Sequence, residues 1–162
     1  MISEIERRIV WDGWFSAEVC AGYFAELSGG YRRWQTVSTW GTLVASSGAL
    51  ATALARAPDQ LSVAFAVAVA GLSIYQVLAR NDHKAIDAAD ISFRWSRLAA
   101  EYRALWMNQH DESAGSRLDD LEARRAEISR AGTAYPNDQR RIRHWYEQVK
   151  ANLAYATARS AA

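Results

Sequence analysis

The middle of the chain is almost free of charge, and this feature restricts the fold more than any other. Over residues 34–79 only Arg56 and Asp59 carry a charge, although the chain contains 19 Lys and Arg and 18 Asp and Glu. Two uncharged windows, 34–55 and 60–79, would form helices about 33 and 30 Å long, close to the roughly 30 Å hydrocarbon core of a bilayer. The short segment between them contains a proline, which favours a turn. The pattern predicts a transmembrane helical hairpin with two spans.

The two predicted spans differ in apolar content. The second contains nine large apolar residues, each favouring insertion by about 0.3–0.6 kcal/mol, whereas the first contains five such residues and seven Ser or Thr. The first span alone would insert marginally, so we expect it to enter as the partner of the second. One alternative is a soluble helical hairpin buried inside a larger bundle, because alanine-rich apolar helices also occur in protein cores.

The flanking charges predict the orientation of the hairpin. Arg32 and Arg33 precede the first span, and Arg80 and Lys84 follow the second. The positive-inside rule therefore places both termini in the cytoplasm. The first residues lack the basic and apolar regions of a secretory signal. The single cysteine, Cys20, excludes an intrachain disulfide and fits a reducing cytosol.

Small and hydroxylated residues define two faces of the spans. Small residues at helical spacing predict close helix packing in both spans; they are Gly41, Ala45, Ala49, Ala64, Ala68 and Gly71. Thr39, Thr42 and Ser46 form an adjoining polar stripe on the first span. Their hydroxyls either bond to carbonyls of their own helix while the stripe packs on a neighbour, or face a water-filled path in an oligomer. The sequence leaves both interpretations open.

The remaining segments are predicted to be helical, and no stretch alternates like a β-strand. We therefore expect an all-α fold with three regions: N-terminal cytosolic amphipathic helices (1–33), the hairpin (34–79) and a C-terminal cytosolic helical region (80–162), the two cytosolic regions together forming a bundle. The C-terminal region is predicted to be helical to about residue 109 and then over 117–131 and 138–158. Its first helix has a coiled-coil spacing of apolar residues, namely Ile91, Trp95, Leu98, Tyr102 and Leu105.

Apolar spacing predicts the buried faces of the other helices. Before the hairpin we expect one helix ending near Asp12-Gly13 and a second ending at Gly29-Gly30. Ile2, Ile5 and Ile9 would form the apolar face of the first, and Val19, Tyr23 and Leu27 that of the second. The last helix of the chain is predicted to bury Ile142, Tyr146, Val149, Leu153 and Ala156.

The sequence contains none of the motifs that usually indicate catalysis. It has no Gly-rich phosphate loop, no Cys-x-x-Cys, no His-Glu-x-x-His and no Gly-x-Ser-x-Gly, so we expect neither an enzyme nor a cofactor. His83, Asp87 and Asp90 share a helix face and could hold a metal ion. An ion pair between Asp90 and Arg94, four residues apart, is the more ordinary interpretation, and we expect no metal site.

A basic cluster is the better candidate for ligand binding. Arg140, Arg143 and His144 lie on the side of the last helix opposite its apolar face, and Arg124 and Arg125 of the preceding helix could join them. Guanidinium groups beside an aromatic ring suit phosphates and a stacked base. The alternative is an ordinary charged outer face, because acidic residues interleave with these cations.

The layout of the chain resembles a known family. An aromatic amphipathic segment leads to Tyr31-Arg32-Arg33-Trp34 directly before the hairpin, and the helical tail contains Trp95-Ser96-Arg97-Leu98-Ala99-Ala100-Glu101-Tyr102. This arrangement resembles the SLATT family, the two-transmembrane effector domains associated with bacterial nucleotide-signalling systems. The resemblance implies an antiviral (anti-phage) defence effector in the bacterial inner membrane, encoded beside a nucleotidyltransferase, that permeabilises the membrane and stops growth in an abortive infection. It offers no catalytic residues or binding motif to carry over.

Together these features predict a homo-oligomeric, pore-forming membrane effector. Thr39, Thr42 and Ser46 would line an ion channel, gated by a nucleotide or short oligonucleotide made by a partner nucleotidyltransferase. We expect the lipid bilayer as a partner and no binding of duplex nucleic acid. The alternative is a non-conducting membrane anchor whose helical tail recruits a partner protein.

Overall fold

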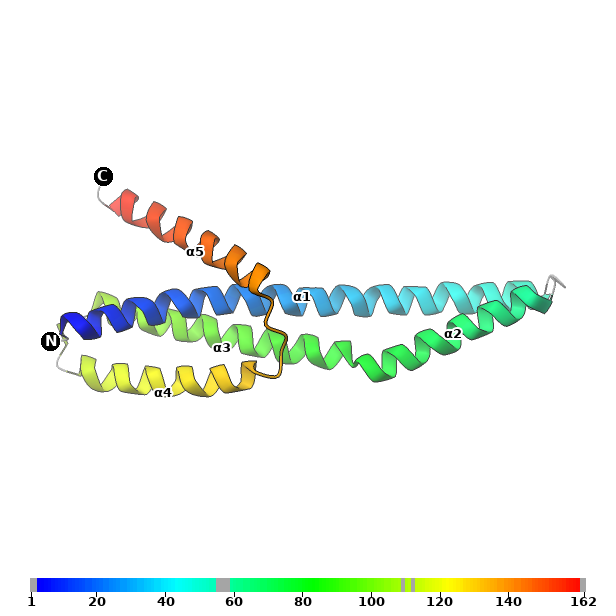
Figure 1. The fold of residues 1–162 in the computed structure, drawn as a ribbon, viewed down its shortest axis with the longest axis horizontal. Coiled ribbons are helices and arrows are strands. Elements are labelled where there is room, and N and C mark those ends of the chain that lie inside the picture. The colour runs from blue at the N-terminus through cyan, green and yellow to red at the C-terminus, as the bar shows by residue number, and fades with distance from the viewer. Residues whose placement is uncertain (1–2, 55–58, 109, 112, 161–162) are drawn as a thin grey trace. The chain divides into compact units, whose positions relative to one another are not determined.

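The chain is all-α, as the sequence predicts. The computed structural model describes residues 3–54, 59–108, 110–111 and 113–160, and the regular structure of these residues is entirely helical. The helices are, in chain order, α1 (Glu4–Leu54), α2 (Asp59–Ala79), α3 (Asn81–Met107), α4 (Ala114–Gly132) and α5 (Gln139–Ser160) (Figure 1). They divide into two compact units, one of residues 1–26 with 88–162 and one of residues 27–87.

The N-terminal helix runs without a break through both predicted stop signals, so the expected ends at Asp12-Gly13 and Gly29-Gly30 are wrong. Gly13 instead makes room for the ring of Tyr102, because a Cβ at this position would lie 2.6 Å from that ring. Gly29 has open space around it. A glycine inside a helix costs about 1 kcal/mol relative to alanine, which is too little to end a helix held by its neighbours on both sides.

The first unit is built around a core formed by α1, α3 and α4. The predicted coiled-coil positions of α3 are all buried, with Ile91 the most exposed at 6%, so this prediction is confirmed. Buried residues of α4 recur at a spacing of three, four or seven, as in coiled-coil packing, whereas those of α1 cover a broader face of the helix. From α1 they include Val10, Ala17, Val19, Ala21, Tyr23 and Phe24, and from α4 Ala114, Leu118, Leu121 and Ile128.

A buried tyrosine joins α3 to α4 inside this core. Tyr102 is fully buried, and its hydroxyl donates a hydrogen bond to Oε1 of Glu122 at 2.7 Å. Arg125 lies 3.3 Å from the same carboxylate oxygen. Burial is the main cause that raises the pKa of the Tyr102 hydroxyl above its usual value, and the nearby Glu122 carboxylate raises it further. The phenol therefore stays protonated and donates, and the positive charge of Arg125 balances the carboxylate that accepts its hydrogen bond.

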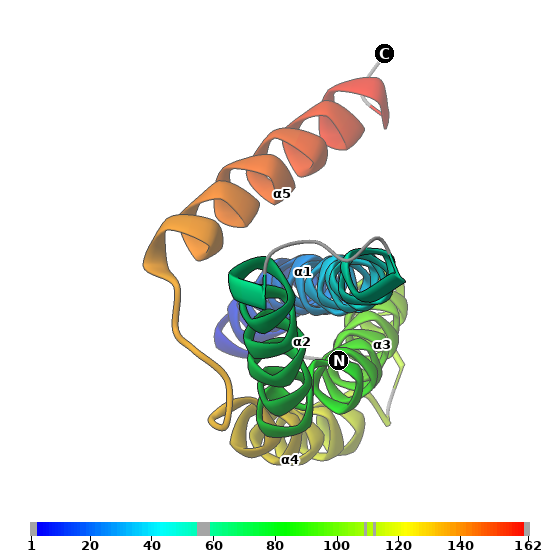
Figure 2. The ribbon, with the colours of Figure 1, turned by 90° about the vertical axis from the view of Figure 1, so that its right-hand side faces the viewer.

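The last helix packs on α1 on the side away from α4 (Figures 1 and 2). The ring of Trp145 lies against Gly22, and the rings of Phe15 and Tyr146 meet edge to face with centroids 4.8 Å apart. The predicted apolar face of α5 is only partly covered: Val149 is buried, Ile142 and Leu153 are half-buried, and Tyr146 is exposed. Ala156 and Ile2 lie outside the residues whose side chains the structure describes.

The expected apolar face of the first turns of α1 is wrong. Ile5 and Ile9 are 75% and 39% exposed, whereas Val10, one position further along the helix, is fully buried. The buried stripe of α1 continues from Val10 through Gly13 and Ala17, and Ile5 and Ile9 lie beside it. Val19, Tyr23 and Leu27 are buried as predicted.

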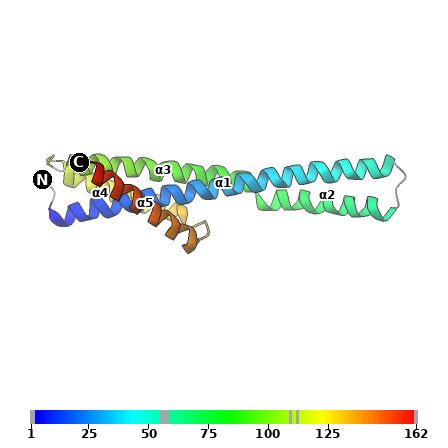
Figure 3. The same ribbon diagram turned by 90° about the horizontal axis from the view of Figure 1, so that it is seen from above.

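The second unit is an antiparallel hairpin of α2 and the second half of α1 (Figure 3). Large residues of α2 pack against small residues of α1: a Cβ at Gly41 would lie 3.5 Å from Leu72, and one at Gly48 would lie 2.7 Å from Phe65. Ala45, between these glycines, is buried. The half-buried residues of α2 follow a 4-3-4-3 spacing and are Phe65, Val69, Leu72, Gln76 and Ala79.

The small residues predicted for packing therefore divide between the two helices. Gly41 and Ala45 lie at the contact with α2, and the side chain of Ala49 is outside the described residues. Ala64, Ala68 and Gly71 do not pack on α1 and are exposed. The reason is steric. The small residues of α1 at the contact leave space, and the larger residues of α2 fill that space.

Helix α2 ends at the residue predicted for the end of the second span. Ala79 is its last residue, and Arg80 follows with φ of 47°, in the left-handed region. An L-residue with a side chain rarely adopts this conformation inside a helix. Arg80 therefore separates α2 from α3, which begins at Asn81.

Replacing Gly22 tests the docking of α5. A Cβ at this position would lie 2.2 Å from the Trp145 ring, so Gly22→Ala is expected to displace Trp145 and loosen α5. Amides of α5 should then exchange with deuterium faster, and trypsin should cleave sooner after Arg143. Gly29→Ala is the matched control, because nothing lies within 4 Å of its Cβ position and it should gain about 1 kcal/mol of helix stability. Equal exchange in the two variants would contradict the packing of Trp145 on Gly22.

Candidate functional site

The hairpin of the second unit turns its large apolar side chains outward. Within residues 34–79, eleven of the described large apolar side chains are between 45% and 75% exposed. They are Trp34, Val37, Trp40, Leu43, Val44, Val63, Val67, Ile74, Tyr75, Val77 and Leu78. Exposed patches of this extent mark surfaces that meet a membrane or another protein.

Polar side chains instead lie between the two helices of the hairpin. Ser38 is 5% exposed, and its hydroxyl donates to the carbonyl of Gln35 at 3.0 Å. The hydroxyl of Thr42 donates to the carbonyl of Ser38 at 2.9 Å and accepts a hydrogen bond from Nε2 of Gln76 at 3.0 Å. The contact between α1 and α2 therefore holds these polar groups together with the apolar Phe65 and Leu72, while many large apolar side chains face outward.

The three predicted pore-lining residues do not share one surface. Thr42 is half-buried in the contact with α2, whereas Thr39 and Ser46 are exposed and lie two turns apart. The hydroxyl of Thr39 donates to the carbonyl of Gln35 at 2.9 Å, and that of Ser46 to the carbonyl of Thr42 at 2.6 Å. Every hydroxyl of the stripe therefore bonds to its own helix, and only Thr39 and Ser46 remain available to a surface outside the hairpin.

One stretch among the described residues is long and apolar enough to cross a membrane. It is Val63–Met107, and its apolar part is not buried. This stretch contains most of the predicted second span. No second stretch of this kind occurs among the described residues. The insertion of the first predicted span, which contains seven Ser and Thr, therefore stays a prediction.

Arg124 and Arg125, the two residues of α4 that were predicted to bind a ligand, are engaged in ion pairs. Arg124 contacts Glu101 of α3 at 2.7 Å and also pairs with Asp120 of its own helix. Arg125 pairs with Glu122, the carboxylate that Tyr102 contacts. Their positive charges are thus balanced by acidic residues of α3 and α4.

The basic residues of α5 occupy a different place. Arg140, Arg143 and His144 are exposed, and α5 lies on the opposite side of α1 from α4 (Figures 1 and 2). The structure therefore does not bring Arg124 and Arg125 to these residues, and the predicted five-residue cluster is wrong in this respect. The separation arises because α5 packs on α1 through Trp145, a tertiary contact that the spacing along one helix does not reveal.

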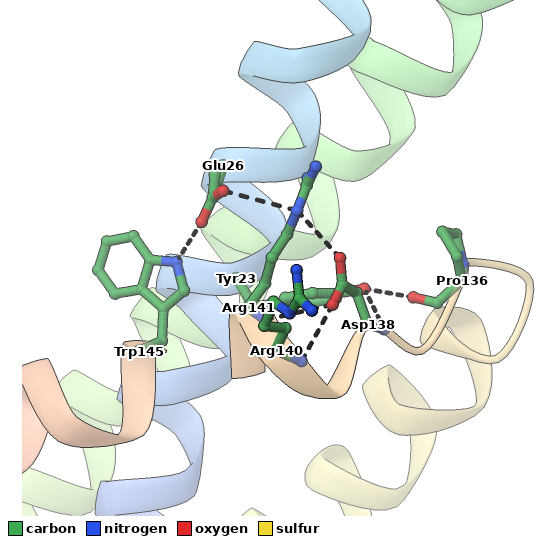
Figure 4. Close-up of polar contacts among 7 residues, drawn as sticks. All are labelled: Tyr23, Glu26, Pro136, Asp138, Arg140, Arg141 and Trp145. Atoms are coloured by element: carbon green, nitrogen blue, oxygen red, sulfur yellow. Dashed lines mark hydrogen bonds and ion pairs between the residues drawn. The ribbon is translucent and has the colours of Figure 1, made fainter. Parts of the chain in front are cut away.

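A polar network fixes the start of α5, as Figure 4 shows. Oε2 of Glu26 accepts a hydrogen bond from Nε1 of Trp145 at 2.8 Å, and its other oxygen lies 3.7 Å from Nε of Arg141. Arg141 also pairs with Asp138 at 3.2 Å. The hydroxyl of Tyr23 donates to the carbonyl of Pro136 and accepts from the backbone N–H of Asp138 at 3.3 Å. Trp145 is therefore a docking residue of α5.

The candidate metal ligands are engaged in ordinary surface contacts. Asp90 pairs with Arg94 at 2.9 Å, and His83 lies 3.8 Å from Asp82. Asp87 is exposed. No group of three metal-ligating side chains occurs in the described part of the chain.

Sequence reasoning did not identify a cavity of the first unit that is open to the surface, with the exposed residues Ser129, Thr133, Pro136 and Asn137 in its walls. Its volume is about 400 Å³, and the helices α1, α3, α4 and α5 and the α4–α5 connection contribute to its walls. The residues that line it are Val19, Cys20, Tyr23, Phe24, Trp95, Ser129, Gly132, Thr133, Tyr135, Pro136, Asn137 and Ile142. Periodicity indicates that Tyr23 and Trp95 are buried, but no local signal shows that the residues around them leave a space.

Comparisons with known proteins do not identify the chain. No family model matches it, and searches of curated proteins and of solved structures give no match. The resemblance to the SLATT family therefore stays an expectation from the layout of the sequence.

The hydrogen bond between Gln76 and Thr42 gives a test of the polar contact inside the hairpin. Gln76→Leu should destabilise the protein by about 1 kcal/mol, the range of a hydrogen bond between helices in a membrane-like environment. Denaturation of the detergent-solubilised protein with sodium dodecyl sulfate, followed by circular dichroism, measures this change. Ser73→Ala is the matched control on α2, because Ser73 is exposed and bonds only to Val69 of its own helix. Equal stability of the two variants would contradict the bond.

Proposed function

We propose that this chain is a two-span protein of the bacterial inner membrane with both termini in the cytoplasm. The observation that carries the proposal is the exposed apolar surface of the hairpin, where eleven large apolar side chains are 45–75% exposed, while Thr42 and Gln76 bond to each other between the helices. Fully burying one such side chain favours folding or insertion by about 1.5–3 kcal/mol. A bilayer covers the outward face without requiring any further part of this chain. Arg32 and Arg33 before the hairpin and the cations after it, Arg80 and Lys84, support the orientation.

In this proposal several copies form an ion-conducting pore, because one hairpin cannot enclose a path for ions. Thr39 and Ser46 line the pore, and Thr42 holds the two spans together through Gln76. No charged residue occurs within either predicted span, so conduction depends on hydroxyls and backbone dipoles. The oligomer acts as an anti-phage effector whose opening depolarises the membrane and arrests growth, in keeping with the resemblance to the SLATT family.

The pore is controlled by a nucleotide or short oligonucleotide made by a partner nucleotidyltransferase. Arg140, Arg143 and His144 are the preferred contacts for its phosphates, because their side chains are exposed on one helix. Arg124 and Arg125 are no longer part of this site, since Glu101, Asp120 and Glu122 already neutralise them. The ligand shifts the pore only to the extent that it binds the open and closed states with different affinity.

A second candidate function is a non-conducting membrane anchor whose helical tail recruits a partner protein. The observation in its favour is that the hydroxyls of Thr39, Thr42 and Ser46 all bond to carbonyls of α1. Hydroxyls used in this way need no water-filled path.

The membrane potential of bacteria that express the chain separates these two functions. A voltage-sensitive dye should report depolarisation, either by the chain alone or only together with its genomic neighbour. If the chain is present in the membrane fraction after an alkaline carbonate wash and neither condition depolarises the cells, the anchor is the function. If the wash releases the chain, the membrane proposal itself is wrong.

Replacing Ser46 tests the lining of the pore. Ser46→Leu places a bulky apolar side chain on the exposed stripe and should reduce the ion flux at least several-fold without lowering expression in the membrane. Ser47→Leu is the matched control, because Ser47 is also exposed and bonds to its own helix but points about 100° away around the helix. Undiminished flux in a well-expressed Ser46→Leu variant would remove Ser46 from the lining.

A further inference from the structure

Another hollow of the first unit is an open groove between the first turns of α1 and the end of α3. Its volume is about 520 Å³, within the range of roughly 300–1,000 Å³ found for ligand pockets. The residues that line it are Glu4, Ile5, Arg7, Arg8, Trp11 and Trp106. The two tryptophans are half-buried and the other four residues are exposed, so a charged ligand placed here keeps part of its hydration.

Two arginines of this groove have no counterion. Neither Arg7 nor Arg8 forms an ion pair within the described part of the chain. Arg94 and Arg97 of the same unit, by contrast, pair with carboxylates four residues away. Glu4 is the acidic residue of the groove, and two guanidinium groups against its one carboxylate leave the groove positive. Because guanidinium groups match the geometry of phosphate oxygens, the groove favours a phosphate.

Tryptophan rings lie beside these arginines. Spacings of three and four residues place Arg7, Arg8 and Trp11 on one face of α1. The ring of Trp11 contacts that of Trp106 with centroids 5.4 Å apart and planes tilted by 55°, and it contacts Trp14 edge to face at 5.5 Å. Two neighbouring rings therefore hold Trp11 in place, so a ligand that stacks on it costs little side-chain freedom. Nucleic-acid bases stack on such rings without regard to their sequence.

We propose that this groove binds a nucleoside phosphate, with the base against Trp11 and Trp106 and the phosphates on Arg7 and Arg8. Such a ligand uses both kinds of side chain at once. Inorganic phosphate would leave the rings uncovered, and an uncharged aromatic compound would leave the arginines without a counterion.

The groove is separate from the exposed cations at the start of α5. Helix α5 begins at Gln139, and its Trp145 docks on Gly22 and Glu26 of α1. These two residues lie about four to five helical turns further along α1 than Arg8. Binding in the groove does not require the hairpin to conduct ions, so failure of this site and failure of the proposed pore are different outcomes.

Titration calorimetry of the detergent-solubilised full chain tests the site with three probes: ATP, adenosine and tripolyphosphate. We expect ATP to bind about tenfold or more tightly than tripolyphosphate, the contribution of one stacked base. Adenosine, which lacks the phosphates, should also bind more weakly than ATP. Absence of ATP binding would overturn the site, and equal binding of ATP and tripolyphosphate would overturn the role of the tryptophans.

Charge variants show where the nucleotide binds. Arg7→Gln should weaken the binding of ATP by about three- to tenfold, because it removes a charged donor. Glu4→Gln should tighten it, because it removes a carboxylate that repels the phosphates. Arg130→Gln is the matched control: Arg130 is exposed on α4, has no ion pair with any described residue and lies outside the groove. An equal loss in Arg7→Gln and Arg130→Gln, or a loss in Arg143→Gln and none in Arg7→Gln, would overturn the site.

A variant of Trp11 tests the stacking. In Trp11→Leu the affinity for ATP should approach that for tripolyphosphate, whereas the affinity for tripolyphosphate should stay the same. Circular dichroism checks that the helices remain formed. Trp14→Leu is the matched control, because Trp14 belongs to the same group of rings but does not line the groove. An equal loss of ATP binding in the two variants would show that the rings act only through packing and would contradict the stacking of a base.

Discussion

The hairpin depends on one steric relation, the fit of large side chains of α2 into a surface of α1 that lacks them. Phe65 and Leu72 occupy the spaces beside Gly48 and Gly41, and this close approach brings Gln76 within hydrogen-bond distance of Thr42. The other large apolar side chains of the hairpin, eleven among the described residues, face outward. The outward apolar face, and with it the proposed place in a membrane, follows from this fit.

Periodicity along a single helix predicted the parts of the fold that depend on one helix. The 4-3-4-3 spacing from Ile91 to Leu105 is a local property, and all five residues are buried as expected. The end of α2 at Ala79 was also predicted, because the change from apolar to charged residues occurs there. The expected helix end at Gly13 was wrong because the role of this glycine depends on a distant partner, whereas Gly29 and Gly30 have no side chain near them and α1 simply continues through them. Gly13 accommodates Tyr102 and Gly22 accommodates Trp145, and neither partner is near in sequence.

The same limit applies to the candidate sites. Arg124 and Arg125 belong to a basic run when the sequence is considered alone, but Glu101 and Glu122 neutralise them across or along the bundle. Thr42 separates from Thr39 and Ser46 because Gln76, 34 residues further along the chain, reaches it. The cavity beside Trp95 could not be predicted, since packing defects depend on the simultaneous fit of four helices. Sequence patterns thus identified most of the buried residues, with Ile5, Ile9 and Tyr146 as exceptions, and not which residues meet.

The attachment of α5 has a consequence for how the first unit can come apart. The hydrogen bond from Trp145 to Glu26 and the packing of α5 on Phe15 and Gly22 are contacts with α1. The hydrogen bond between Tyr102 and Glu122 joins α3 to α4 and does not involve α5. Parts of a protein with few buried contacts open with the smallest free energy, before the global unfolding of the core. We therefore expect α5 to detach before the three-helix core unfolds, which would expose the Trp145 ring.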